Sequence, residues 1–213
     1  METAGRFSNA VLHAWQSVSF GSTRTSSIST LFISLANICR VSPEKRVDRA
    51  IEIAGRDGGP LCVAAKIDRA DRAYFDREIA PLFERPFVQY HGEVNGRAKE
   101  TLLGRARALL FPIDWQEPFG LVMIEAMACG TPVVAWRGGS VEEVITPGVS
   151  GFIVDSLDEA VDATRRAATL DRRRVRAEFE ARFTAPRMAR DYLSIYESVV
   201  GTPRRSMPRL AVT

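Results

Sequence analysis

The sequence predicts an α/β fold, a doubly wound parallel sheet of the Rossmann-like type. Short apolar runs alternate with amphipathic helical patterns from Leu31 to Val200. The runs are apolar throughout, which is typical of strands that are buried on both faces. Strand–helix units that repeat with such strands favour one parallel sheet with helices on both sides. We therefore expect six parallel strands that are flanked by helices.

Six apolar runs bounded by turn residues are the expected strands. In chain order they are residues 31–38, 61–65, 87–90, 108–111, 132–136 and 152–154. Their lengths are typical of strands. All of them are far shorter than the roughly 20 apolar residues that a bilayer-spanning helix needs. A soluble or at most peripheral protein without a transmembrane segment is therefore expected.

Amphipathic patterns between and after these strands are the expected helices. They cover residues 42–55, 69–82, 97–105, 119–128, 141–145, 157–169, 171–182 and 186–200. Ser42 can cap the first helix, with Pro43 at its first position, where proline's missing N–H costs nothing. Ligands of such sheets bind outside the carboxyl ends of the strands, so the loops after the strands are the places to search for chemistry.

The length of the chain, 213 residues, suits one well-cored domain and a short extra segment. We expect that domain at residues 31–200. Residues 1–30 are rich in Ser and Thr and contain one acidic residue, Glu2, so they are expected to be poorly ordered. Residues 201–213 are expected to be a C-terminal tail.

Charge and cysteine usage restrict the partners. The net charge of +3 suits anionic small ligands or a membrane surface, and no nucleic-acid partner is expected. Cys39, Cys62 and Cys129 have no paired spacing, which indicates reduced thiols in the cytoplasm. With two histidines and no Asp-x-Asp pair, the sequence predicts no metal site and no cofactor.

The most informative stretch is EPFGLVMIEAMACGTPVV, residues 117–134. A strand ends near Phe111, Glu117 lies in the loop, and a helix begins close to Phe119, so the helix N-terminus can bind an anion. Gly120 lets a phosphate approach the backbone. Glu117 could reach a sugar beyond the phosphate, and Glu125 a ribose, because carboxylates accept hydrogen bonds from vicinal diols.

Less specific roles are open for the same residues. Glu117 and Glu125 could be a charge at a helix start and a solvated helix residue. Glu125, however, lies in a stretch that is apolar nearly all round, so its carboxylate needs a partner. Gly138 and Gly139 could cradle a phosphate, but a turn fits them better.

Lysine is scarce in this chain, which otherwise uses arginine. There are three lysines, Lys45, Lys66 and Lys99, among 29 Lys and Arg residues. The bias itself fits genome base composition. Lys45 is expected in the first turn of a helix, where the helix dipole favours acids and disfavours a cation. Because this position does not stabilise the helix, a binding role is favoured over that of a solvated charge. Lys66 at a strand end is open to either a solvated or a binding role.

The spacing of Glu117 and Glu125 within that stretch, followed by GSVEEVI at 139–145 and GFIV at 151–154, resembles the signature of glycosyltransferase family 4. The resemblance extends from Arg40 to the C-terminal helix. It implies a GT-B enzyme that transfers a sugar with retention from a nucleoside-diphosphate sugar, without a metal. It also implies that this chain is the C-terminal, donor-binding half-domain.

The resemblance implies a role for each matching residue. Glu117 would be the catalytic residue that contacts the donor sugar. The implied donor-binding residues are Arg40 and Lys45 at the diphosphate, Lys66 near the nucleotide, Gly92 to Val94 at the base, Phe119, Gly120 and Leu121 at the sugar and phosphate, and Glu125 at the ribose. Cys39 stands where the family usually has glycine.

The family carries an acceptor-binding domain on the N-terminal side, and this chain is expected to lack it, since the residues before Arg40 do not match. Three alternatives to an active half-domain are open. The chain could be a truncated, non-catalytic remnant, one half of a split enzyme with a partner chain, or a sugar-nucleotide epimerase or phosphorylase of the same architecture. A peripheral membrane contact through Arg172, Arg173 and Arg174 is also open.

Overall fold

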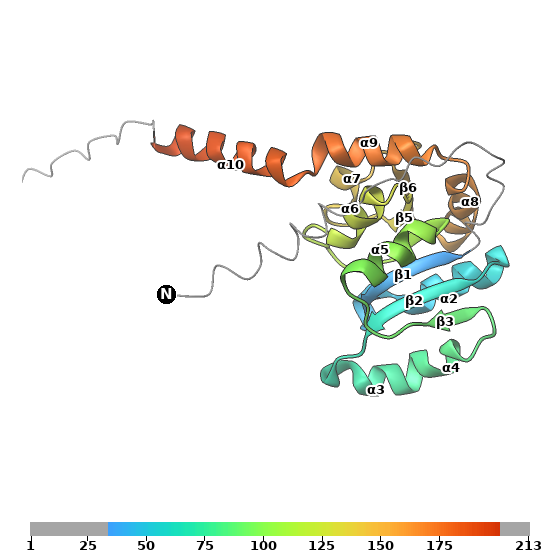
Figure 1. The fold of residues 1–213 in the computed structure, drawn as a ribbon. Helices are drawn as coiled ribbons and strands as arrows, with labels where there is room; N and C mark the ends of the chain where they lie inside the picture. Colours follow the sequence, from blue (N-terminus) through green and yellow to red (C-terminus); the bar gives the residue numbers. More distant parts are fainter. Residues whose placement is uncertain (1–33, 201–213) are drawn as a thin grey trace, which may run out of the picture.

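A parallel sheet of six strands runs through the centre of the computed structural model, which describes residues 34–200 (Figure 1). The strands are β1 (Leu35–Arg40), β2 (Leu61–Lys66), β3 (Val88–Tyr90), β4 (Ala108–Phe111), β5 (Val133–Trp136) and β6 (Gly151–Val154). Their order is β3-β2-β1-β4-β5-β6, and all neighbours pair in parallel. The predicted fold class is confirmed. The expectations for residues 1–30 and 201–213 lie outside the described residues.

The strand order reverses between β1 and β4. From β1 the chain adds β2 and β3 on one side, and then returns to add β4, β5 and β6 on the other. At such a switch point the loops that follow the two strands turn in opposite directions and leave a crevice, where ligands of this fold bind. The loops after β1 and β4 are therefore the first place to look for a site.

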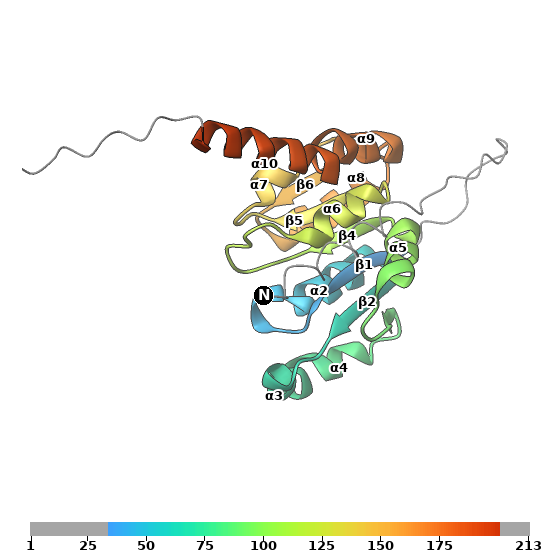
Figure 2. The same cartoon turned by 60° about the vertical axis from the view of Figure 1, so that its left-hand side comes forward.

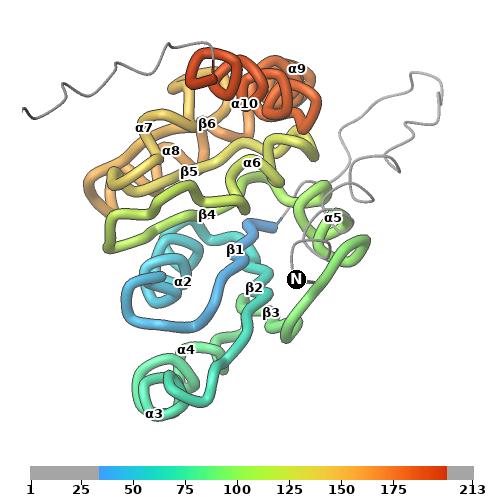
Figure 3. Tube along the Cα trace, turned by 90° about the vertical axis from the view of Figure 1, so that its left-hand side faces the viewer, coloured from blue at the N-terminus to red at the C-terminus, as the bar shows by residue number. Residues whose placement is uncertain are grey.

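Helices cover both faces of the sheet. One core cluster joins the sheet to α2 (Val47–Asp57) and α8 (Leu157–Ala167). The other joins it to α5 (Gly96–Arg105), α6 (Leu121–Ala128), α7 (Val141–Val144) and α9 (Arg172–Arg182). Figure 3 shows α2 and α5 on opposite sides of β1 and β2. All four residues of β4 are buried, as expected for a strand that is covered on both faces.

The first predicted strand and helix have different bounds in the structure. β1 begins at Leu35 and extends to Arg40, beyond the predicted end. In place of one helix over 42–55 there is a 3-10 turn, η1 (Pro43–Lys45), followed by α2. Arg46 separates the two, because its backbone is left-handed (φ 51°, ψ 50°). Ser42 makes no side-chain capping bond to this turn.

The helix predicted over 69–82 is also irregular. It consists of η2 (Arg69–Asp71), α3 (Arg72–Tyr74), a π-helical turn η3 (Phe75–Ile79) and α4 (Ala80–Phe83). Pro81 has no N–H with which to continue the i→i−4 bonds of an α-helix. A π-helical turn just before it accommodates this missing hydrogen bond. In Figures 1 and 2 this segment lies at one end of the molecule, with α9 at the other.

The last helix, α10 (Ala185–Val200), contains no buried residue. Figure 1 shows it continuing beyond α9 and projecting past the sheet. Its exposed apolar side chains include Met188, Tyr192 and Val199. Within the part of the chain that the structure describes, no helix has both the length and the apolar character that crossing a membrane requires.

Candidate functional site

The predicted site residues follow four neighbouring strands at the carboxyl edge of the sheet. Arg40 and Lys66 are the last residues of β1 and β2 and are direct register partners. Both are about half exposed, and each is paired with an acid: Arg40 Nη2 donates to Glu44 Oε1 (2.7 Å), and Lys66 Nζ lies 2.8 Å from Asp68 Oδ1. The hydrogen bond to Asp68 raises the pKa of Lys66, so both cations stay protonated, and each is offset by its acidic partner.

An ion pair bridges the switch point between β1 and β4. Lys45 Nζ lies 2.5 Å from Glu117 Oε2, although the two residues are 72 positions apart in the sequence. The side chains are 19% and 13% exposed, so the pair is largely but not fully shielded from water. The structure thus brings together the two residues for which the family resemblance implies contacts with the diphosphate and the donor sugar.

Trp115 contacts both members of this pair. Its Nε1–H donates to Glu117 Oε2 (3.0 Å), and its ring centroid lies 4.5 Å from Lys45 Nζ. An ammonium over an indole face is attracted by the ring quadrupole. Trp115 is 42% exposed, so the aromatic ring also forms an open surface beside the pair. Trp115 was not predicted from the sequence, because a tryptophan in a loop carries no spacing signal.

The loop that carries Glu117 packs directly on the glycines that follow β5. Ser140 N–H donates to Glu117 O (2.8 Å), and Gly139 N–H donates to Gln116 Oε1 (2.8 Å). A Cβ at Gly139 would lie 2.2 Å from Glu117 O, and the φ of Gly139 is +54°. These glycines therefore form a turn against the Glu117 backbone, as predicted in preference to a phosphate cradle.

Gly120 lies directly before α6 and has a packing role that the sequence did not indicate. Its backbone is left-handed (φ 72°), which explains why α6 begins at Leu121 and not near Phe119. The space that a Cβ would occupy holds Met123 Cε at 2.5 Å and Phe111 Cζ at 3.3 Å. On the side of the missing Cβ, internal packing therefore requires a glycine. Phe119 and Leu121 stand exposed on either side of it.

Glu125 also has a lysine partner. Lys99 Nζ, from α5, lies 2.6 Å from Glu125 Oε1 on α6. The carboxylate has the partner that was expected, but the reasoning from burial was wrong, because the side chain is 37% exposed. Lys99 had been assigned no role. Its signal in the sequence is the scarcity of lysine, since two of the three lysines pair with the two glutamates of the motif.

Gly92 and Val94 lie in the loop after β3, beside the end of β2. Ala65 N–H donates to Gly92 O (2.9 Å), and Tyr90 Oη donates to Ala65 O (2.9 Å). The φ of Gly92 is +68°, and a Cβ there would meet open space. The loop is therefore held against the end of β2 by main-chain hydrogen bonding while one side of it stays open.

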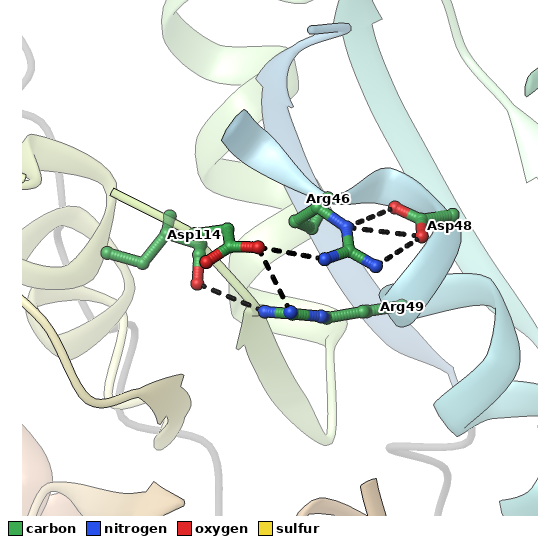
Figure 4. Close-up of polar contacts among 5 residues, drawn as sticks. Arg46, Asp48, Arg49 and Asp114 are labelled. Carbon is green, nitrogen blue, oxygen red and sulfur yellow. Dashed lines mark hydrogen bonds and ion pairs between the residues drawn. The ribbon is translucent and has the colours of Figure 1, made fainter. Parts of the chain in front are cut away.

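A second charged cluster links the loops after β1 and β4. Arg46 Nη1 and Arg49 Nη2 both donate to Asp114 Oδ2, at 2.9 and 3.1 Å (Figure 4). Arg46 also donates to both oxygens of Asp48. Asp114 N–H donates to Glu44 O (2.8 Å). This cluster has no sequence signal, because each of its members is an ordinary surface charge in the sequence.

The three cysteines of the described region form no disulfide. Cys39, Cys62 and Cys129 are free thiols, and burial raises the pKa of Cys39 to about 12 and that of Cys129 to about 11. Cys39 Sγ lies 3.3 Å from Asn37 Oδ1. Among residues 34–200, no group of three or more His, Cys, Asp or Glu side chains is arranged to hold a metal ion.

Comparison with known proteins gives a consistent result. A family model described as "Glycosyl transferases group 1" matches residues 32–182. The D-inositol 3-phosphate glycosyltransferase of Mycolicibacterium smegmatis is 37% identical over 122 residues, which are 54% of this chain and 28% of that protein.

Solved structures share the fold. AviGT4, a glycosyltransferase involved in Avilamycin A biosynthesis, matches with a TM-score of 0.68 and 28% identity over 80% of this chain and 52% of that one. Anabaena Alr3699/HepE, solved in complex with UDP and glucose, has a TM-score of 0.67 at 21% identity and covers 78% of this chain and 48% of that one. The chain thus spans from 28% to 52% of the length of these proteins.

Proposed function

Because this chain belongs to the glycosyl transferases group 1 family, we propose that it provides the donor-binding half of a retaining glycosyltransferase that uses a nucleoside-diphosphate sugar. The observation that carries the proposal is the ion pair between Lys45 and Glu117, which bridges the loops after β1 and β4. This is the position at which a Rossmann-like sheet binds its ligand.

The proposed diphosphate site consists of cations at the carboxyl edge. Arg40 ends β1, Lys45 follows it in η1, and the N-terminus of α6 supplies a partial positive charge. When the bond between the anomeric carbon and the phosphate oxygen breaks, negative charge develops on the nucleoside diphosphate. Fixed positive groups in a partly shielded site stabilise that charge, and this lowers the barrier.

Glu117 would change partners when the donor binds. In the structure its carboxylate accepts from both Lys45 and Trp115. A diphosphate carries more negative charge than a carboxylate and would compete for the Lys45 ammonium. Glu117, still held by Trp115, would then accept hydrogen bonds from hydroxyl groups of the donor sugar. The exposed ring of Trp115 lies beside that position.

Glu125 is proposed to bind the ribose. A carboxylate can accept two hydrogen bonds from vicinal hydroxyl groups, and Lys99 holds this one in place across α5 and α6. The loop of Gly92 and Val94 is proposed to meet the base through its backbone, because a Cβ at Gly92 would meet open space. No metal ion has a role in this proposal. Anabaena HepE, solved with UDP and glucose, is a precedent for such a ligand on this fold.

Binding measurements on the wild type and four variants test the proposal. Lys45→Ala and Glu125→Ala should both lose affinity for the preferred ligand among UDP, GDP, ADP and the corresponding sugar nucleotides, measured by titration calorimetry. Glu117→Gln should bind the free nucleoside diphosphate as the wild type does but lose the extra affinity that the sugar supplies.

Arg72→Ala is the matched control, because Arg72 forms an exposed ion pair with Asp76 on the helical segment before β3. All variants are first shown to be folded by circular dichroism. Unchanged affinity in both Lys45→Ala and Glu125→Ala would refute the assignment of the donor site.

A further inference from the structure

Arg46 adopts a backbone conformation that arginine rarely tolerates. Within residues 34–200 it is the one non-glycine residue with a positive φ, at 51°. In this left-handed region the Cβ of an L-residue crowds the following carbonyl, which is why glycine is the usual occupant. An arginine here needs a compensating interaction, and strain that the surroundings hold in place is a frequent feature of functional sites.

The compensating interaction is made by the guanidinium group. Arg46 Nε and Nη2 donate to the carboxylate of Asp48, at 3.0 and 2.8 Å. The remaining nitrogen, Nη1, donates to Asp114 Oδ2 at 2.9 Å (Figure 4). The planar fork of arginine serves two carboxylates at once, which the single ammonium of a lysine cannot reproduce. One side chain thus ties the start of α2 to the loop after β4.

Two further bonds fix the same junction. Arg49 Nη2 donates to Asp114 Oδ2 (3.1 Å), and Asp114 N–H donates to Glu44 O (2.8 Å). Asp114 is therefore held through both its side chain and its backbone by the segment that follows β1. In Figure 4 Arg46, which directly precedes α2, and Arg49, which lies in α2, converge on this carboxylate. We call Arg46, Arg49 and Asp114 the loop clamp.

The clamp lies immediately beside the Lys45–Glu117 pair. Lys45 directly precedes Arg46, and Glu117 follows Asp114 in the same loop. Besides the clamp, the two loops are joined near this point by the bond from Asp114 N–H to Glu44 O and by the ion pair itself, which a bound diphosphate would open. A link that the ligand does not disturb would keep the loops at a fixed separation during binding.

We propose that Arg46 is a positioning residue that sets the separation of Lys45 and Glu117 through its bond to Asp114. The role in ligand binding rests on the proposed function, whereas the role in placing the two side chains does not. A purely local role, as a brace on the first turn of α2, would need the contact with Asp48 alone. The bond to Asp114 therefore distinguishes the two interpretations.

The indole N–H of Trp115 reports on the clamp without any ligand. It donates to Glu117 Oε2, so a change in the position of Glu117 shifts its ¹H–¹⁵N resonance. The chain has three tryptophans, and the spectrum of Trp115→Phe identifies the resonance. The variants are Arg46→Gly, which removes the side chain and relieves the strained backbone, Asp114→Ala, the double variant, and Asp114→Asn, which keeps the shape of the side chain.

Arg46→Gly and Asp114→Ala should both shift the Trp115 resonance, and the double variant should shift it no further than either single change. Affinity for the preferred ligand among UDP, GDP, ADP and their sugars should fall about fivefold in each, as expected for a partly exposed charge pair, and again not additively. Arg72→Ala should change neither quantity. Asp114→Asn keeps the shape of the side chain and should shift the resonance in the same direction as Asp114→Ala.

A Trp115 resonance that keeps its wild-type position in Arg46→Gly and in Asp114→Asn overturns the clamp. Independent effects that add in the double variant overturn it as well, because they show two unrelated local roles. If the wild-type chain binds none of the nucleotides while the resonance shifts as expected, the proposed function fails and the clamp stands.

Discussion

Replacing Gly139 with alanine should displace the loop that carries Glu117. A Cβ built on Gly139 lies 2.2 Å from Glu117 O and 2.4 Å from Glu117 N, where real Cβ contacts stay beyond 3.0 Å. The nearest atoms are backbone, so no side-chain rotation relieves the clash. The difference between 3.0 and 2.2 Å means that the loop must move by about 0.8 Å. Gly148 provides the control, because its φ is also positive (+76°) and its Cβ would meet nothing within 4 Å.

The expected loss of stability has two parts. Both substitutions place alanine in a left-handed backbone, at a cost of about 1 kcal/mol. Gly139→Ala adds about 1–3 kcal/mol for overpacking. It also weakens the bond from Ser140 N–H to Glu117 O (2.8 Å), for about 1 kcal/mol more. We therefore expect a loss of about 3–5 kcal/mol for Gly139→Ala and about 1 kcal/mol for Gly148→Ala.

Urea unfolding followed by circular dichroism gives both free energies of unfolding. Titration with the preferred sugar nucleotide then compares the folded variants, and Gly139→Ala should bind more weakly than Gly148→Ala because Glu117 has moved. Equal losses of stability in the two variants would refute the packing of Gly139 on Glu117. Wild-type affinity in Gly139→Ala would show that the position of this loop is irrelevant to binding.

Three further predictions concern other parts of the chain. Glu117→Gln should lose the sugar contribution to binding while the affinity for the nucleoside diphosphate persists; an equal loss for both ligands would contradict its assignment to the sugar. Burial raises the pKa of Cys39 to about 12, so this partly buried thiol should react with a disulfide reagent much more slowly in the native state than in urea, and equal rates in the two states would contradict the shielding of the thiol. The hydrogen bond from Thr146 and the pairing with Arg182 lower the pKa of Glu178. The stability it supplies is present above the ordinary pKa of a glutamate and is lost as the pH falls through the lowered value, so Glu178→Gln should flatten the acid side of the stability profile in urea unfolding. An identical acid profile for this variant would count against the assignment.

The strands were predictable because their signal is local. Residues 108–111 and 152–154 are short apolar runs between turn residues, and the structure has strands there with at most one residue of difference. The same signal fails at the two irregular helices. At Arg46 the backbone is decided by contacts with Asp48 and Asp114, and the second of these is far away in the sequence. The π turn before Pro81 depends on how the helix accommodates the missing N–H donor of the proline, and the sequence pattern does not specify this.

The site was predictable in its residue types but not in its pairings. The motif of Glu117 and Glu125 stands out in the sequence, whereas its partners Lys45 and Lys99 lie on other elements. Which acid meets which lysine is fixed by the strand order, and the loops after β1 and β4 become neighbours only in the folded sheet. At Gly120 the sequence suggested only that a phosphate could approach the backbone; the positive φ and the side chains that fill the space beside it depend on the folded core.

Thermal unfolding of the whole chain with UDP, GDP, ADP and their sugars tests the central claim most directly. A ligand present at about 100 times its dissociation constant stabilises the native state by about 2.7 kcal/mol. We predict a clear rise in the melting temperature with one nucleotide and its sugar, and its loss in Lys45→Ala. A folded chain whose melting temperature is unchanged by every one of these ligands would contradict the claim that the Lys45–Glu117 pair marks a nucleotide-sugar site.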